Sequence, residues 1–379
     1  MTGPDSVWAI RGQTRAAGVL RRAAASGEIG HAWAFLGPAG VGQERAAGAL
    51  VASLTCADAV APCGVCESCA RALAERHPAY TEFAPSGAVH RVADVRERWL
   101  PVAHRSAGEG GWKVLRVVEA DRMNDAAANA FLKGLEEPPP QTVWLLDIED
   151  PDDLPATILS RCRAVRFTPL DSASLDEEAR QLGLTDATDR GLAVRASFGS
   201  PERLARLARD GGLEAVRAHR QIPRRLRSHR GEPLVAAYAI ELQAGTWAKG
   251  VEVDAKKKRA ALEAAHGESA PRALVRELEE RETSAAREAR TAAIAAALDD
   301  LAAWYRDVLV VKAGGDPADA VHADDPEGLA EDAAALSAAV VLSALDTILD
   351  TRAALERNAS SRLALEACFM DLAARSLTG

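Results

Sequence analysis

Short apolar runs alternate with helix-period patterns along the first 170 residues of the chain. The runs that predict buried strands read HAWAFLG, WKVLRVVEA, TVWLLDI and AVRFTPL, and a shorter strand is expected near Tyr80–Phe83. Amphipathic helices are predicted between them, for example in QERAAGALVASLTC and NDAAANAFLKGLEE. Strands that alternate with helical crossovers indicate a parallel, helix-covered sheet, so we expect an α/β module over residues 1–170.

Beyond this module the strand signals end and the pattern becomes helical. Short helices, with Asp186 and Ser200 as capping residues, predict a small helical domain over residues 171–211. Residues 212–379 predict an all-helical domain, with a long charged helical segment at about residues 250–310. The predicted fold class is therefore α/β plus all-α.

The composition changes this picture little but excludes some functions. The chain has 379 residues and a formal net charge of −9, with 48% apolar and only 4% aromatic residues. Such a chain suits helix-rich packing, and its acidic total argues against a free-standing electrostatic binder of nucleic acid. No secretory signal is visible, and the most apolar stretch, LSAAVVLSALDTILD, is interrupted by Ser343, Asp346 and Asp350. A cytoplasmic protein is expected.

A glycine-rich segment, GPAGVGQE, joins a predicted strand to a predicted helix. It fits the phosphate-loop frame G-x-x-x-x-G-K-[ST] at Gly37 and Gly42. Gln43 and Glu44 replace the lysine that reaches the phosphates and the hydroxyl that holds Mg²⁺. The loop has therefore lost the two side chains that ATP chemistry needs most.

Losses elsewhere point in the same direction. At the end of WKVLRVVEA, Val118 and Glu119 stand where a Mg²⁺-binding Asp and a water-polarising Glu are expected. Asp147 and Glu149 stand around the place of a polar sensor residue, and Glu44 adds negative charge where phosphates would lie. These features favour a decayed nucleotide site. A plain strand-to-helix turn, or an anion held by the loop's N–H groups, remains an alternative.

The cysteines predict a metal site. Four of the six cluster in CADAVAPCGVCESC, namely Cys56, Cys63, Cys66 and Cys69. Four thiolates suit a closed, tetrahedral, structural Zn²⁺ site, because no coordination position remains for water. An iron–sulfur cluster or unligated thiols are the alternatives, and His77 is a spare candidate ligand.

Several arginines are candidates for contacts with phosphate. Arg161 in ILSRC is either an ordinary solvated or ion-paired charge or an arginine finger for a neighbouring subunit. Arg203 in SFGSPERLARL is either an exposed helix residue or a contact to a nucleotide site. The Arg-rich segment Arg217–Arg230 is interpreted as a solvated helical face, with phosphates or an acidic partner as the alternative.

Taken together, these motifs resemble the delta-prime family of bacterial DNA polymerase III clamp-loader subunits, which are AAA+ proteins. The resemblance is carried by GHAWAFLGPAGVG, the four-cysteine insertion, MNDAAANAFLKGLEEPPPQTVWLL, LPATILSRC and FGSPERLARL, in this order. It is strong over residues 8–210 and returns in RAALERNASSRLALEACFM, whereas residues 250–320 match no pattern that we can name.

The resemblance implies an AAA+ module with a zinc insertion, a helical lid and a C-terminal collar domain. It implies assembly with gamma/tau and delta subunits, and action on the β sliding clamp and primer–template DNA. Arg161 falls on the family's trans-acting arginine finger, and the four cysteines fall on its zinc ligands. With Gln43 and Glu44 in the loop, ATP hydrolysis by this chain is not expected.

Two rival functions follow from the same residues. An ATP-hydrolysing gamma/tau-type subunit shares the cysteine module and the SRC element, but it should retain the Lys, Thr and Asp-Glu that are missing here. A stand-alone, zinc-containing nucleic-acid-binding protein should carry a basic footprint, which an acidic chain with one Arg-rich segment lacks.

Overall fold

The computed structural model describes residues 3–27, 29–58, 60–85, 89–105, 111–209, 211–228, 231–266, 272–356 and 359–376. The chain forms two compact units, Met1–Arg209 and Asp210–Gly379.

Unit 1 is built on a five-stranded sheet in which every neighbouring pair of strands is parallel. The strands are β1 (Ala32–Leu36), β2 (Tyr80–Phe83), β3 (Lys113–Val117), β4 (Thr142–Ile148) and β5 (Arg163–Arg166). Their order across the sheet is β2-β3-β4-β1-β5, so β1 lies between β4 and β5. The parallel sheet predicted from the apolar runs is confirmed.

Helices connect and cover these strands. The longer ones are α2 (Thr14–Ala25), α3 (Gln43–Thr55), α6 (Asp125–Glu136), α8 (Ser172–Gln181) and α9 (Ala187–Ala196). The shorter ones are α1 (Pro4–Val7), α4 (Glu67–Leu73), the π-helix η1 (Asp94–Trp99), α5 (Leu100–His104), α7 (Ala156–Leu159) and α10 (Pro201–Leu207). Single 3₁₀ turns are η2 (Ala120–Arg122) and η3 (Pro151–Asp153).

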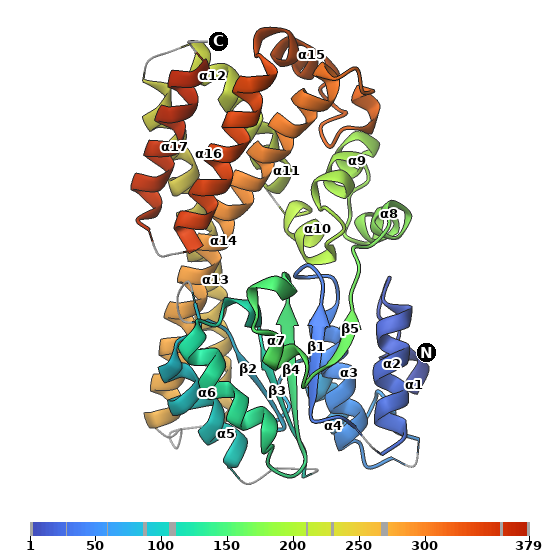
Figure 1. The fold of residues 1–379 in the computed structure, drawn as a ribbon. Helices are drawn as coiled ribbons and strands as arrows, with labels where there is room; N and C mark the ends of the chain where they lie inside the picture. Colours follow the sequence, from blue (N-terminus) through green and yellow to red (C-terminus); the bar gives the residue numbers. More distant parts are fainter. Residues whose placement is uncertain are drawn as a thin grey trace. The chain divides into compact units, whose positions relative to one another are not determined.

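The period-2 alternation of the strands divides the core into two layers. Trp33 and Phe35 of β1 face the layer that contains residues of α2, α3 and α4. Ala32 and Ala34 face the opposite layer, with residues of η1, α6 and α7. Figure 1 shows α6 and α7 on the other side of the sheet from α3. Both faces are therefore covered, which explains why the strands read as continuous apolar runs.

The three helices after β5 each begin with a capping side chain. Asp171, Asp186 and Ser200 accept hydrogen bonds from backbone N–H groups three residues further on. Such caps satisfy donors that have no partner inside the helix. The helical pattern and the two caps expected at Asp186 and Ser200 are confirmed.

Unit 2 is helical throughout the part that the structure describes. Its elements are α11 (Gly212–His219), α12 (Ile222–Ser228), α13 (Glu232–His266), α14 (Arg272–Lys312), η5 (Pro317–Asp319), α15 (Pro326–Ala335), α16 (Ala338–Glu356) and α17 (Ser361–Ser376). Trp304, Tyr305 and Phe369 are buried in its core. The charged segment expected at about 250–310 falls on α13 and α14, except for residues 267–271, which lie outside the described residues.

No single helix among the described residues is long and apolar enough to cross a membrane, although α15 and α16 pass as a pair joined by a bend of 107°.

The Arg-rich segment is paired with acidic residues of its own unit. Arg220 Nη1 lies 2.8 Å from Asp324 Oδ2, and Arg227 contacts the fully buried side chain of Asp332. Arg224 is 3.5 Å from Asp325, and its guanidinium lies over the ring of Trp304. The interpretation as a solvated face is therefore wrong for these residues, because the end of α11 and α12 face acidic residues of α15 and of the loop before it. Arg230 lies outside the described residues.

Candidate functional site

The Gln43 side chain fills the turn of the glycine-rich loop 37–44, the segment predicted to be a phosphate loop. Gln43 is only 3% exposed. Its Oε1 accepts a hydrogen bond from the Val41 N–H at 3.1 Å, and its Nε2 donates to the Pro38 carbonyl at 2.7 Å. Gly37 and Gly42 take the positive φ values, 144° and 123°, that shape the loop. In phosphate loops the backbone N–H groups hold the nucleotide. Here the amide of Gln43 occupies one of these donors itself.

The start of α10 closes over the same loop. The Ser200 hydroxyl donates to the Gly40 carbonyl at 3.2 Å. Gly40 has a positive φ of 73°, and a Cβ atom there would lie 2.6 Å from Glu202 Oε2 and 2.9 Å from Ser200 Oγ, so a side chain would displace both groups. From the other side, Gln13 Nε2 donates to the Val41 carbonyl at 2.9 Å. The Glu202 carboxylate therefore lies against the loop, where it would repel a phosphate.

Glu44 adds to this concentration of negative charge. Partial burial raises the pKa of Glu44 to about 7, the charges of Glu202, Glu75 and Glu82 act in the same direction, and Arg116 opposes them. The Glu44 side chain is still 49% exposed, so water screens much of the repulsion. The electrostatics nevertheless disfavour a polyphosphate at the start of α3.

Arg116 forms a buried ion-pair network beside the loop. It projects from the middle of β3 and is 4% exposed. Its Nε and Nη2 donate to Asp147 Oδ2 at 2.9 and 2.6 Å, and its Nη1 donates to Glu82 Oε2 at 2.8 Å. Nη2 also lies 3.9 Å from Glu44 Oε1. Burial raises the pKa of Asp147, and the charge of Arg116 opposes that shift. Asp147, which was expected in the sensor region, is thus paired with Arg116 inside the same unit.

Two further residues of the predicted nucleotide site also have internal partners. Glu119 adopts the left-handed conformation, with φ 52° and ψ 50°, and its Oε2 lies 3.1 Å from Arg122 Nη1. Arg203 Nε donates to the Ala196 carbonyl at 2.8 Å, and its guanidinium carbon lies 4.7 Å from the centroid of the Phe198 ring.

The four clustered cysteines converge as a metal site would require. The Sγ atoms of Cys56, Cys63, Cys66 and Cys69 all lie within 4.8 Å of one another. The Cys56–Cys66 and Cys63–Cys69 sulfur distances are 3.9 and 4.0 Å. A tetrahedron of thiolates about 2.3 Å from Zn²⁺ has edges of roughly 3.8 Å, so the set fits this ion. Gly64, with φ 78°, provides the tight turn between the first pair of C-x₂-C cysteines.

Backbone hydrogen bonds support the same cluster. The Cys66 N–H donates to Cys63 Sγ, and the Cys69 N–H donates to Cys66 Sγ, both at 3.4 Å. Donors of this kind stabilise thiolates and orient metal ligands. His77 Nδ1 accepts from the Ala79 N–H at 3.0 Å, and its Nε2 lies 3.1 Å from the Ser68 hydroxyl. Over the described residues, the four cysteines are the one convergent group of potential ligands, and His77 is not among them.

Arg161 lies at the surface, directly after α7. Its Nη2 is 2.5 Å from Glu136 Oε1, at the end of α6, and its Nη1 donates to the Thr157 carbonyl at 2.8 Å. The side chains of Arg161 and Glu136 are 37% and 50% exposed. The charge that the resemblance assigns to an arginine finger is therefore accessible and has two acceptors within its own unit.

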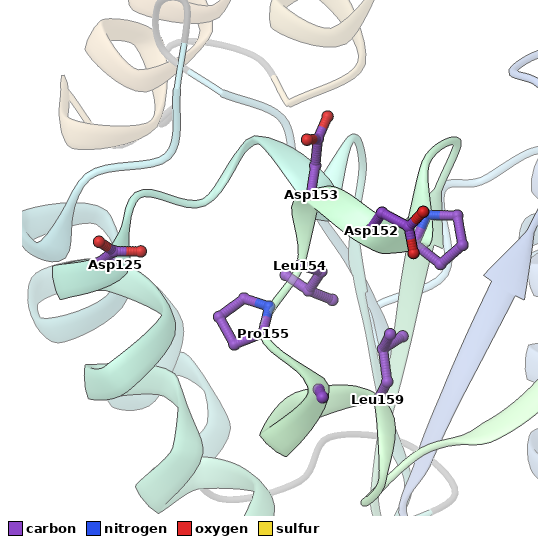
Figure 2. A pocket seen from close by; sticks show the side chains of 8 residues that line it. Asp125, Asp152, Asp153, Leu154, Pro155 and Leu159 are labelled. Carbon is purple, nitrogen blue, oxygen red and sulfur yellow. The ribbon is translucent and has the colours of Figure 1, made fainter.

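An open pocket lies beside the same helix. Its lining includes Leu154, Pro155 and Leu159, with Asp125, Asp152 and Asp153 around it. Figure 2 shows these carboxylates well separated rather than directed at one point. The described residues that line the pocket include neither convergent metal ligands nor a basic group for phosphate.

Sequence reasoning missed Arg116 and Glu136. Arg116 left a signal, because a lone charge inside the apolar run VLRVV requires a buried partner. Glu136 left none, since its contact with Arg161 depends on how the end of α6 meets the end of α7.

The fold defines the class: an α/β module with a five-stranded parallel sheet, in which a glycine-rich loop joins β1 to α3. Residues 12–171 match the family model described as "DNA polymerase III, delta subunit".

Three known proteins are similar to part of this chain. DNA polymerase III subunit delta' of Haemophilus influenzae is 39% identical over 138 residues, which cover 35% of this chain and 41% of that protein. Its counterpart in Pseudomonas aeruginosa is 37% identical over 190 residues, covering 48% and 57%. DNA polymerase III subunit gamma/tau of Mycobacterium bovis is 34% identical over 212 residues, covering 52% and 36%. The chain spans about half the length of the delta-prime relatives that it matches. Over this region its resemblance to the delta-prime subunits is confirmed.

Proposed function

We propose that this chain is a non-hydrolysing structural subunit of the bacterial replicative clamp loader. In this role it helps gamma/tau and delta subunits to load the β sliding clamp onto primer–template DNA in the cytoplasm. Its parts are an AAA+ module over residues 1–170, a helical lid over 171–211 and a collar domain over 212–379. The similarity of residues 12–171 to delta-prime subunits supports this assignment.

The observation that carries the non-hydrolysing role is the internally occupied phosphate loop. Gln43 lacks the charge that a nucleotide needs, and its amide uses the Val41 N–H as a donor. Glu44 and Glu202 place carboxylates against the loop. We propose that the loop is retained as scaffold and holds no ATP.

The chemistry that this subunit contributes is assigned to Arg161. An arginine finger stabilises the charge that develops on a phosphoryl group during transfer. Arg161 is exposed on the surface of unit 1, and we propose that it reaches ATP bound to a neighbouring gamma/tau subunit. Cys56, Cys63, Cys66 and Cys69 would hold a structural Zn²⁺, which stabilises the N-terminal module without taking part in the reaction.

ATP turnover tests this proposal. The chain alone should show none, whereas a mixture with gamma/tau, delta, clamp and primer–template DNA should hydrolyse ATP. Arg161→Ala should lower the rate at the adjacent site by about 10³-fold or more. Arg166→Ala, an exposed arginine of β5, is the matched control and should leave the rate unchanged. A wild-type rate with Arg161→Ala would remove Arg161 from this role.

The gamma/tau-type ATPase is the alternative, supported by the 34% identity to such subunits. It requires turnover by the chain alone that is abolished by changes in its own loop. The zinc-containing nucleic-acid-binding alternative requires DNA binding by the isolated chain at physiological salt. The pairing of Arg220, Arg224 and Arg227 with acidic residues disfavours it.

A further inference from the structure

We infer that Glu136 is the positioning residue for Arg161, an inference that rests on the proposed role of Arg161 in a neighbour's ATP site. Arg161 Nη2 lies 2.5 Å from Glu136 Oε1, and Nη1 donates to the Thr157 carbonyl at 2.8 Å. A guanidinium has five N–H donors in a fixed plane. These contacts use two of the five N–H donors of Arg161 to orient its guanidinium plane. The other three donors remain for phosphate oxygens.

Both ends of the pair are attached to rigid structure. Leu135, next to Glu136, is 1% exposed, and Ile158, at the base of the Arg161 turn, is fully buried in the same core layer. The Arg161 N–H donates to the Ile158 carbonyl at 3.0 Å. Helices α6 and α7 lie on one side of the sheet (Figure 1). The backbone positions from which the two side chains project are therefore set by the packed core rather than by a flexible loop.

The exposure of the pair determines what Glu136 can do. Exposed ion pairs contribute little to folding stability, so the contact is not needed to hold α6 and α7 together. An arginine that is fixed before it meets its target loses less conformational freedom on binding. Glu136 therefore acts on the orientation of the finger and hence on the rate of the step that the finger assists.

The test uses the reconstituted complex with Glu136→Gln, which keeps the size of the side chain and removes its charge. We expect kcat at the adjacent site to fall roughly fivefold with KM for ATP unchanged. The affinity for ADP–aluminium fluoride, a transition-state mimic, should fall by the same factor. Glu137→Gln is the matched control, because Glu137 is the next residue and is also exposed. It should behave as wild type.

The double variant Glu136→Gln/Arg161→Ala separates this inference from the proposed function. A positioning residue has no effect once its target is gone, so the double variant should be no slower than Arg161→Ala alone. An unchanged kcat for Glu136→Gln, or an equal further loss in the Arg161→Ala background, would overturn the positioning role and leave the finger intact. A wild-type rate for Arg161→Ala would refute the finger itself, and the positioning role with it.

Discussion

The Arg116 network gives the sharpest prediction about stability. In the variant Arg116→Met, the aliphatic part of the side chain is largely kept and the charge is removed. Asp147 then loses both of its hydrogen bonds from Arg116, at 2.6 and 2.9 Å, while its side chain is only 13% exposed. Its Oδ1 is also buried without a hydrogen-bond partner among the described residues.

The expected magnitude follows from the exposure of each partner. Glu82 and Glu44 are 40% and 49% exposed, so their pairs with Arg116 contribute at most about 1 kcal/mol each. Removing one partner of a buried pair costs about 3–5 kcal/mol, and Asp147 meets that condition. We therefore expect a loss of about 3 kcal/mol. For a unit of 209 residues this corresponds to a fall in Tm of roughly 6–12 °C.

Differential scanning calorimetry of the full chain measures the shift, and hydrogen exchange of peptides from β3 and β4 locates it in unit 1. The double variant Arg116→Met/Asp147→Leu should recover most of the loss, because no unpaired charge remains. Arg180→Met, which breaks pairs of a 53% exposed arginine, is the control and should cost less than about 1 kcal/mol. A Tm within about 2 °C of wild type for Arg116→Met, or a double variant as unstable as the single, would refute the reasoning.

Two further predictions concern the cysteine cluster and Glu44. Cys66→Ser should lose bound zinc, which elemental analysis measures. It should also lower the Tm of unit 1, since a structural zinc contributes folding free energy. Full metal retention would contradict the four-thiolate site. The pKa of Glu44 is about 7 in the folded chain, against an ordinary value of 4.5. Ionisation of Glu44 therefore lowers the free energy of unfolding as the pH rises from about 4.5 to 7. Urea titrations measure the decrease in the free energy of unfolding between pH 5 and pH 8. This decrease should be smaller in Glu44→Gln than in wild type, by less than about 1 kcal/mol because the Glu44 side chain is half exposed. An identical decrease would exclude Glu44 as a source of the pH dependence.

Much of unit 1 could be predicted because its signals are local. Buried parallel strands need apolar side chains on both faces, and the runs around Trp33, Leu115 and Trp144 meet this requirement without reference to the rest of the chain. The caps at Asp186 and Ser200 act over three residues. The cysteines converge because two C-x₂-C turns bring sulfurs together over a short span.

The candidate site was only partly predictable. The loss of the lysine and hydroxyl at Gln43 and Glu44 is visible in the sequence. That the Gln43 amide turns back onto Val41, and that Glu202 lies against Gly40, depends on how the loop and α10 approach each other. Nothing in the residue types alone distinguishes an empty loop from one filled by its own side chain.

The sequence by itself determined where charges are lost or concentrated, namely the loop with Gln43 and Glu44, the arginine inside β3 and the Arg-rich segment Arg217–Arg230. Only the tertiary structure decided what those charges meet. Arg116 and Asp147 are 31 positions apart, Arg161 and Glu136 are 25 apart, and Arg220 and Asp324 are 104 apart. Breaking an ion pair costs little when both partners are exposed and several kcal/mol when one is left buried and unpaired, so the cost depends on packing that no local pattern encodes.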